Sequence, residues 1–441
     1  MGVTMTAGER TAEPNGHRPR TVARVGRALA IGAALVLAAA GGFGGALGAA
    51  AVTARPAVFL TCGAAVTALL GGAGLWAALG NLPRVRRIWA VALLLGALEL
   101  IGAVAVLTPT GGRTPAPVDG ASFWRLETGS RLAYVRIPGV APRRPTPVVV
   151  LHGGPGVPDM AGDAAYFGKL SKLGYDVYVY DQLGSGRSTR LADPAGYSVE
   201  RDVADLDAVR RAIGAGRMIL VGHSAGGALA AHYVAAHPDR VDRLVLSSPG
   251  PLDPSDTSGD RATAGLATGR RLRSYAAALE PRALLGYLLL QVDPAAAHAY
   301  LPDAEADARN DTILTTAEPA LHCTPAQAHG GVRGTGFYRL QYPQSATASA
   351  PPDPRPALAG LPVPALIFKG SCDYLSWRSA LDYRRVLPRS ILVYLDGAGH
   401  NTYQDRPAEV LADITAFLTG RPLPVSAYPR QAAPPGYAGP R

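Results

Sequence analysis

Residues 218–227 of the chain read Met-Ile-Leu-Val-Gly-His-Ser-Ala-Gly-Gly. The first four residues are apolar and favour a short buried strand, and a helix-like segment, Ala228–Ala236, follows. The G-x-S-x-G pattern between them is the sharp strand-to-helix turn that holds a serine hydroxyl clear of the sheet. The pattern alone arises often by chance in a chain rich in glycine and alanine, but this flanking order is specific. It therefore indicates Ser224 as a nucleophile.

Two other motifs occur upstream in a fixed order. Residues 152–156 read His-Gly-Gly-Pro-Gly, and residues 181–188 read Asp-Gln-Leu-Gly-Ser-Gly-Arg-Ser. The apolar runs Pro147–Leu151 and Asp176–Tyr180 precede them, so each motif is expected at the end of a strand. Three such turns in this order seldom arise by chance, and together they predict a serine hydrolase.

Strands and helices are expected to alternate from about Ala121 onward. Helical spacing of apolar residues marks Val199–Ile213 and Pro407–Leu418 as helices. The expected strands are Phe123–Thr128, Arg131–Ile137, Pro147–Leu151, Asp176–Tyr180, Met218–Val221, Leu244–Leu246, Ala365–Phe368 and Ile391–Leu395. This alternation predicts an α/β fold with a doubly wound, mostly parallel sheet.

One long segment breaks the alternation. It runs from Ser248 to Leu361, is rich in alanine, shows no clear strand and is too long for a simple connection. We expect it to be an inserted, mainly helical lid that covers the active site. The predicted organisation is a core at 121–250 and 361–421, a lid at 251–360 and a flexible tail at 422–441.

A serine hydroxyl attacks a carbonyl only when a base removes its proton. His400 follows the last expected strand in a glycine-bearing loop, and Asp373 follows the strand before it. Asp373 would orient the imidazole and stabilise its protonated form. The chain order Ser224, Asp373, His400 is the one expected of a triad built around this kind of serine turn.

Other residues compete for these roles. Asp396 is a rival acid, but it lies only four residues before His400. The rival histidines either belong to the turn motifs, where they are expected to support loops, or lack a position after a late strand; they are His152, His223, His232, His237 and His322. We therefore prefer Asp373 and His400.

The attacked carbonyl becomes an oxyanion, which requires backbone donors already in position. The N–H of Ala225 is expected to be one donor, because free amides at the start of a helix point toward the site. The second donor should come from the glycine turn after Pro147–Leu151. Gly154 is preferred and Gly153 is the alternative, since neither has a side chain that would block the approach.

Three apolar stretches precede this domain: Ala28–Val52, Pro56–Gly80 and Ile88–Leu107. Each is about as long as the roughly 20 residues that a helix needs to cross a bilayer. Only the third carries a charge, Glu99. We expect a three-helix transmembrane anchor at 28–107, an N-terminal arm at 1–27 and a linker at 108–120.

Arginines indicate the topology of this anchor. They precede the first stretch and fill the second connection, whereas the first connection carries only Arg55; the clustered residues are Arg18, Arg20, Arg24, Arg27, Arg84, Arg86 and Arg87. The positive-inside rule places the arm in the cytoplasm, so that three crossings put the catalytic domain outside the cell membrane.

Composition excludes several function classes. The formal charge is +10, but basic residues are not interleaved with aromatics as in a nucleic-acid-binding surface. The motifs require no metal and no cofactor.

Of three cysteines, Cys323 and Cys372 lie in the catalytic region, where an oxidising compartment would permit one bridge between them. Two separate buried thiols are the alternative.

The motifs at 152–156, 181–188, 222–227 and 397–400 resemble those of the proline iminopeptidase family of α/β-hydrolases, over about 123–418. The resemblance implies the triad Ser224, Asp373 and His400, with the oxyanion site at the glycine turn and Ala225. The sequence departs from the family at Leu183, where the family usually has arginine, and at Ala225, where it often has tryptophan. Family members bind the substrate's amino group through acidic lid residues, for which Glu318 is the candidate in this chain.

The sequence thus predicts a membrane-anchored serine hydrolase that acts on short peptides, removing an N-terminal residue such as proline. One alternative is an esterase or amidase that acts on a small non-peptide substrate. The other is a non-catalytic membrane receptor or scaffold, against which the complete triad argues.

Overall fold

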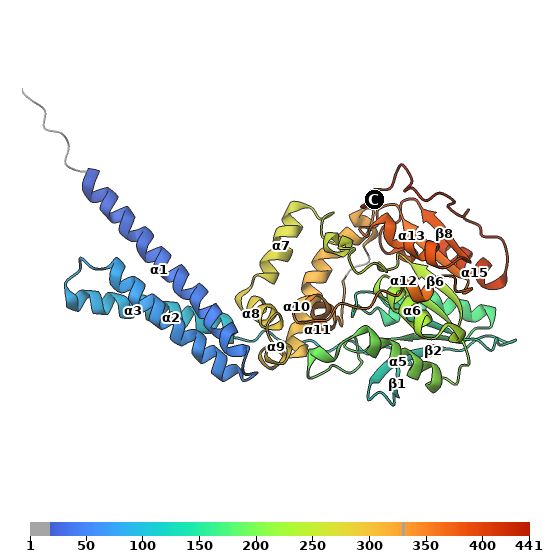
Figure 1. The fold of residues 1–441 in the computed structure, drawn as a ribbon, viewed down its shortest axis with the longest axis horizontal. Helices are drawn as coiled ribbons and strands as arrows, with labels where there is room; N and C mark the ends of the chain where they lie inside the picture. The colour runs from blue at the N-terminus through green and yellow to red at the C-terminus, as the bar shows by residue number, and fades with distance from the viewer. Residues whose placement is uncertain (1–17, 329–330) are drawn as a thin grey trace, which may run out of the picture. The chain divides into compact units, whose positions relative to one another are not determined.

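The computed structural model describes residues 18–328 and 331–441, and the chain divides into two compact units, 1–108 and 109–441. Most of the expected N-terminal arm, residues 1–17, lies outside the described residues. Figure 1 shows the helical first unit in blue and the mixed second unit from green to red.

From residue 18 onward, the first unit contains three helices, α1 (Arg18–Ala50), α2 (Pro56–Ala78) and α3 (Arg84–Leu107), each long and apolar enough to cross a membrane. Small residues let α1 and α2 approach closely. A Cβ atom at Gly63 of α2 would lie 2.8 Å from the Gly42 carbonyl oxygen and 3.1 Å from the Ala46 side chain. Glycine and alanine thus define the contact between these two helices.

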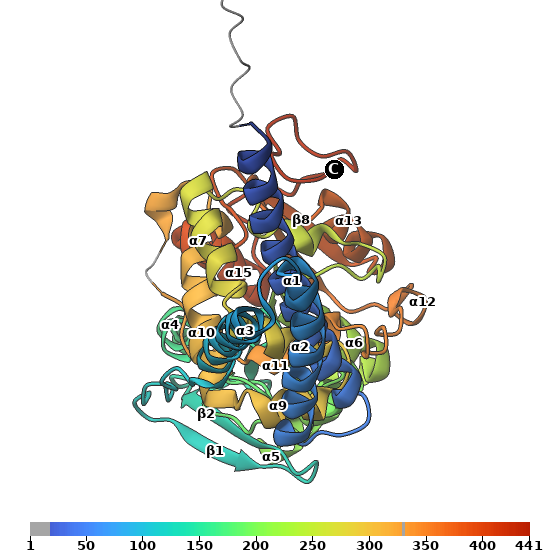
Figure 2. The ribbon, with the colours of Figure 1, turned by 90° about the vertical axis from the view of Figure 1, so that its left-hand side faces the viewer.

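The second unit is built on an eight-stranded sheet with the order β1-β2-β4-β3-β5-β6-β7-β8. Its strands are β1 (Ser122–Arg125), β2 (Arg131–Ile137), β3 (Val148–Leu151), β4 (Val177–Tyr180), β5 (Met218–His223), β6 (Val241–Ser247), β7 (Ala365–Gly370) and β8 (Ser390–Leu395). β2 pairs antiparallel with β1 and β4, and all other pairs are parallel. In Figures 1 and 2 the β1–β2 hairpin lies at the bottom and β8 near the top. The predicted mostly parallel α/β sheet is confirmed.

Helices bury the sheet. They are α4 (Met160–Phe167), α5 (Val199–Ala212), α6 (Ala225–Ala236), α13 (Trp377–Val386), α14 (Thr402–Asp405) and α15 (Pro407–Thr419). Alternate strand residues, such as Val148 and Val150, pack with Phe167 of α4 and Phe417 of α15 in one hydrophobic core. Because β3, β4 and β5 are buried on both faces, their sequences are nearly continuous apolar runs.

The segment between β6 and β7 is mainly helical and forms a separate layer. Its α-helices are α7 (Thr268–Ala278), α8 (Pro281–Leu290), α9 (Pro294–Tyr300), α10 (Asp303–Ala317), α11 (Phe337–Gln341) and α12 (Arg355–Leu358). Figure 1 shows α7 to α11 grouped beside the sheet. This segment is called the lid below.

The structure differs from the expected flexible tail at 422–441. Residues after Arg421 lie along β8 and α13: Tyr428 N donates to Leu392 O at 2.7 Å, and Trp377 N donates to Pro440 O at 2.7 Å. Tyr437 is buried. Proline-rich composition suggested a loose segment, but aromatic burial and backbone hydrogen bonds hold it against the core.

Candidate active site

The candidate catalytic residues lie at the carboxyl edge of the parallel strands. Ser224 follows β5 directly, Asp373 follows β7, and His400 follows β8. Parallel strands end at the same edge, so residues far apart in the sequence meet there. All three side chains are buried, with relative exposures of 7%, 0% and 3%.

Ser224 lies in a strained turn. Its φ of 51° falls in the left-handed region, which a residue with a side chain seldom adopts. The turn requires close backbone approach, because a Cβ atom at Gly226 would collide with the Leu151 carbonyl oxygen. The chain therefore passes from β5 into α6 without a connecting loop, and α6 begins at Ala225, as the oxyanion prediction requires, three residues before the helix-like segment Ala228–Ala236. The Ala225 N–H, at the first helical position, has no acceptor within the helix.

His400 and Asp373 form a hydrogen-bonded pair. His400 Nδ1 donates to Asp373 Oδ1 at 2.8 Å, which leaves Nε2 as the nitrogen available to a proton from serine. Asp373 Oδ1 also accepts from Leu375 N at 3.1 Å. Burial opposes ionisation of Asp373, but Lys369 and His400 outweigh burial and hold the pKa of this carboxyl well below its usual range. Asp373 is therefore a carboxylate at neutral pH.

Tyr374 is a residue of this site that sequence reasoning missed. Its hydroxyl lies 3.4 Å from His400 Nε2 and also hydrogen-bonds to Ser224. Its ring packs on the imidazole, with centroids 4.4 Å apart. Its position directly after Asp373 was the only sequence signal for it.

The two upstream motifs interlock through His152. Its Nε2 accepts a hydrogen bond from Gln182 N at 3.0 Å, and its Nδ1 donates to Gly153 O at 2.9 Å. Gln182 Nε2 returns a hydrogen bond to His152 O at 2.8 Å. Burial lowers the pKa of His152 to about 4, which matches a neutral ring that both accepts and donates. His152 thus supports the glycine turn rather than acting as a base.

The glycine turn itself lies against the serine. A Cβ atom at Gly153 would lie 3.0 Å from Ser224 Cβ. Gly154 has a φ of +119°, a conformation that favours glycine. Both predicted second donors to an oxyanion therefore belong to the turn beside Ser224.

His223 packs between the serine turn and His400. Its ring centroid is 4.9 Å from that of His400, and its Nδ1 lies 3.1 Å from Ser247 O. Burial, reinforced by His400, lowers the pKa of His223 to about 3, so it is neutral at pH 7. It supports the loop and is not a second base.

The lid is tied to the catalytic loops at two places. The first is residues 334–339: Gly336 N donates to Gly156 O at 2.8 Å, Gly186 N donates to Gly334 O at 2.7 Å, and Arg339 pairs with Asp202. These contacts join the lid to both upstream motifs.

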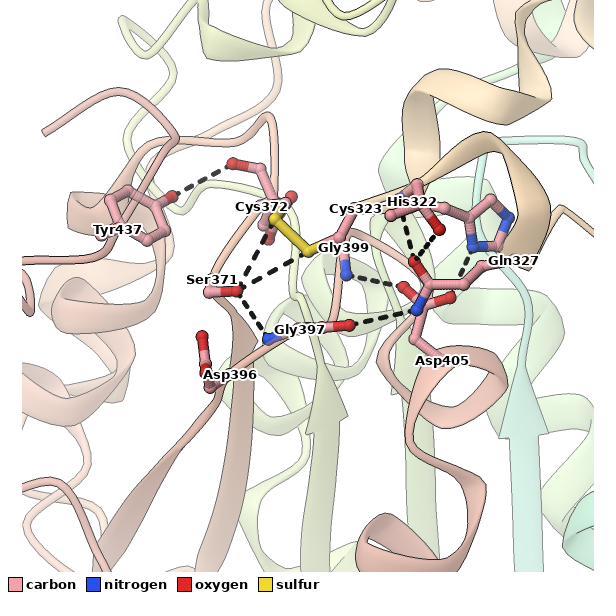
Figure 3. The surroundings of a disulfide bond; sticks show 12 residues. His322, Cys323, Gln327, Ser371, Cys372, Asp396, Gly397, Gly399, Asp405 and Tyr437 are labelled. Carbon is pink, nitrogen blue, oxygen red and sulfur yellow. Dashed lines mark hydrogen bonds and ion pairs between the residues drawn. A yellow bond between two sulfur atoms is a disulfide. The ribbon is translucent and has the colours of Figure 1, made fainter.

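The second place surrounds a disulfide between Cys323 of the lid and Cys372, the neighbour of Asp373 (Figure 3). His322 Nδ1 lies 2.6 Å from Asp405 Oδ1, and His400 N donates to Leu321 O at 2.7 Å. The bridge that the cysteine positions suggested is present. It joins the lid to the loop of the candidate acid, while the backbone of the lid contacts the candidate base.

Glu318, the candidate for binding a substrate amine, begins the same lid segment. It is buried, and its Oε1 lies 3.9 Å from His322 Nε2. Among the described residues, no cluster of three or more histidine, cysteine, aspartate or glutamate side chains has the arrangement of a metal site.

Comparison with known proteins identifies the class. Residues 146–407 match the family model described as "alpha/beta hydrolase fold". This match covers more than half of the chain, and the chain therefore belongs to the α/β-hydrolase family.

Two curated relatives differ in name and in coverage. A proline iminopeptidase of Heyndrickxia coagulans is 40% identical over 106 residues, which cover 24% of this chain and 35% of the relative. The human protein named 1-acylglycerol-3-phosphate O-acyltransferase ABHD5 is 30% identical over 280 residues, 60% of this chain and 75% of the relative. The predicted resemblance to proline iminopeptidases is confirmed, although the match spans only about a third of that relative.

Among solved structures, the proline iminopeptidase of Mycobacterium smegmatis aligns with 68% of this chain and 98% of its own, at 19% identity and a TM-score of 0.46.

Proposed function

We propose that this protein is a membrane-anchored serine hydrolase whose nucleophile is Ser224, with His400 as base and Asp373 as its orienting acid. The observation that carries the proposal is the 2.8 Å contact between His400 Nδ1 and Asp373 Oδ1 beside a serine held in a strained strand-to-helix turn. Packing of a structural core does not by itself require a serine with left-handed backbone angles at the start of a helix.

The proposed reaction proceeds through an acyl-enzyme. Ser224 Oγ attacks the substrate carbonyl while His400 Nε2 takes its proton, and the N–H groups of Ala225 and Gly154 stabilise the oxyanion. The protonated imidazole then gives its proton to the leaving amine or alcohol. Water, deprotonated by the same nitrogen, releases the acid product. In unliganded enzymes such hydrogen bonds are often long, which is consistent with His400 Nε2 contacting Tyr374 here.

The proposed substrate is a short peptide whose N-terminal residue, proline or a similar residue, is removed. The 40% identity to proteins named proline iminopeptidase supports this choice. Glu318 is the proposed partner of the substrate's amino group, because it is a buried carboxylate on the lid segment that contacts the His400 backbone. A lid that restricts the site to short chain ends would explain release of single residues.

We further propose that the catalytic unit lies outside the cytoplasm. Three candidate spans and the arginine distribution support this topology. The Cys323–Cys372 disulfide supports it independently, since such bonds persist in oxidising compartments.

A second candidate function is an esterase that acts on a non-peptide acyl substrate. The longer matches, over about 60% of this chain, are to proteins named as an acyltransferase and as a (lyso)-N-acylphosphatidylethanolamine lipase. The same three residues serve ester and amide hydrolysis, so the triad does not separate the two.

Turnover of matched substrates separates these functions. The full-length protein in lipid nanodiscs would be assayed with prolyl- and alanyl-naphthylamide, with their N-acetylated forms, and with short-chain nitrophenyl esters. The peptidase proposal predicts hydrolysis of the free aminoacyl amides and at least tenfold less of the acetylated forms. A Glu318→Gln variant should raise KM for the free amides and leave ester turnover unchanged. Ester turnover without any aminoacyl amide turnover would establish the second candidate instead.

A further inference from the structure

Lys369 is a buried charged residue that the proposed mechanism does not use. The chain has only three lysines, Lys169, Lys172 and Lys369. Lys369 lies on β7 with 0% exposure. Its ammonium group donates to Asp373 Oδ2 at 2.7 Å, Leu375 O at 3.1 Å and Ser379 Oγ at 3.3 Å. Three acceptors match the three hydrogens of a charged ammonium.

A lysine at this depth is costly unless its charge has a partner. Removing an ammonium from water carries a penalty that an apolar residue of similar volume would avoid. The partner here is Asp373, whose two carboxylate oxygens face opposite directions: Oδ1 accepts from His400 and Oδ2 from Lys369. The cation and the imidazole therefore compete for one negative charge.

We propose that Lys369 is a positioning residue that extends the Ser224–His400–Asp373 chain: by sharing the Asp373 carboxylate, it fixes Oδ1 against the imidazole and weakens the stabilisation that the carboxylate gives to the protonated ring. The inference rests on the proposed function. A carboxylate that hydrogen-bonds only to His400 would stabilise the imidazolium fully, and the base would be lost at higher pH. Lys369 takes part of that charge and also fixes the carboxylate so that Oδ1 faces the ring.

Other groups that face this cluster were weighed. His223 faces His400 from β5 and is neutral, because burial lowers its pKa to about 3. Tyr374 faces His400 Nε2, and burial raises its pKa, so its phenol is also neutral. On the far side of Lys369 lie Asp256, which accepts from Ser376 and attracts the ammonium, and the Tyr437 ring, 5.9 Å away.

A hydrogen-bonded pair also lies on the lid side. His322 and Asp405 contact each other beside the backbone of Gly399 and His400: Gly399 N donates to Asp405 Oδ2 at 2.6 Å. These two residues contact backbone atoms of the His400 loop, whereas Lys369 contacts the carboxylate that holds the imidazole. Lys369 is therefore the cation that shares Asp373, the carboxylate that holds His400.

The test is the pH dependence of Ser224 labelling by a fluorophosphonate, measured on full-length protein in nanodiscs. Lys369→Met removes the charge and the donor, and Lys369→Gln keeps a donor but removes the charge. Both variants should move the acid limb of the labelling rate upward by about one pH unit. The proton taken up is shared by the Asp373–His400 pair. The same substitution at the exposed Lys172, Lys172→Met, is the matched control and should leave the limb in place.

The outcomes are distinguishable. An unshifted limb in a folded Lys369 variant, with only lower thermal stability, would show that the lysine is structural and overturn the inference. If neither variant folds, Lys369→Arg decides: it keeps a cation beside Asp373, so the inference expects the acid limb to stay at its wild-type pH, and an upward move of about one unit would overturn it. Absence of labelling in the wild type would instead contradict the proposed function.

Discussion

The catalytic core and the lid differ in the kind of contact that stabilises each of them. In the core, backbone atoms fix the site: Ser224 N donates to Ser247 O at 3.0 Å, and Gly226 has no side chain because the Leu151 carbonyl lies against it. In the lid, pairs of charged side chains add to the backbone hydrogen bonds and the disulfide, such as Arg282 with Glu305 at 2.8 Å and Arg190 with Asp307 at 2.9 Å. Backbone geometry requires glycine at fixed spacing and therefore leaves a motif in the sequence. Pairs of charged side chains leave none.

This difference suggests that the core determines the reaction, whereas the lid determines stability and access to the site. Substitutions in the core should change the rate of the reaction, whereas substitutions in the lid contacts should change stability and access to the site. The predictions below test that separation, from the largest expected effect to the smallest.

Asp373→Asn should lower kcat by roughly 10⁴-fold, because an amide in place of the carboxylate no longer stabilises the protonated His400. Steady-state hydrolysis of an activated ester by the nanodisc-embedded protein measures the effect. The matched control is Asp396→Asn in the exposed rival acid, which should change kcat less than twofold. A large loss in Asp396→Asn and a small one in Asp373→Asn would reverse the assignment of the acid.

Removal of the disulfide should destabilise the second unit without removing the chemistry. The double variant Cys323→Ser/Cys372→Ser opens a link across 49 residues, which corresponds to about 3–4 kcal/mol of unfolding free energy. Urea unfolding followed by tryptophan fluorescence measures the loss, and fluorophosphonate labelling at 4 °C should persist.

Cys62→Ser is the control for the disulfide prediction, since Cys62 is the free cysteine and lies in α2. It should leave the unfolding transition unchanged. Equal stability of the double variant and the wild type would mean that the lid is held without the bridge.

Asp163→Asn should have the smallest effect on the reaction rate, and its effect on stability should depend on pH. Burial raises the pKa of Asp163 to about 8, and Tyr403 OH donates to it at 3.0 Å. Because the folded value exceeds the unfolded value of 3.8, the stabilisation is complete below about pH 4 and is lost as pH rises through about 8.

Thermal unfolding at pH 5 and pH 9 tests this prediction. Asp163→Asn should raise Tm relative to the wild type at pH 9 and change it little at pH 5. The exposed Asp239→Asn variant should show no such difference. A constant offset for Asp163→Asn at both values would mean that the carboxyl stays ionised in the folded protein.

The comparison of core and lid also explains how much could be predicted. The strand ends and the order of Ser224, Asp373 and His400 follow from apolar runs and glycine turns, which are local in the sequence. The start of a helix at Ala225 follows from the serine turn, although helix propensity disfavours the two glycines after it and marks only Ala228–Ala236.

Two further features were beyond local reasoning. The docked tail depends on the burial of Tyr437 and on hydrogen bonds to β8 and α13, elements that lie in an earlier part of the chain. Tyr374 lies beside His400 because β7 ends beside β8, so only the folded sheet creates this contact, whereas Lys369 reaches Asp373 from four residues earlier in the chain.

The central claim is that Ser224 is the nucleophile of an α/β-hydrolase, and covalent labelling tests it most directly. The nanodisc-embedded protein would be treated with a fluorophosphonate, digested and mapped by mass spectrometry. The account predicts one adduct, on Ser224, which is absent from Ser224→Ala and at least 10³-fold slower to form in His400→Ala. An adduct on another residue, or undiminished labelling of Ser224→Ala, would contradict it.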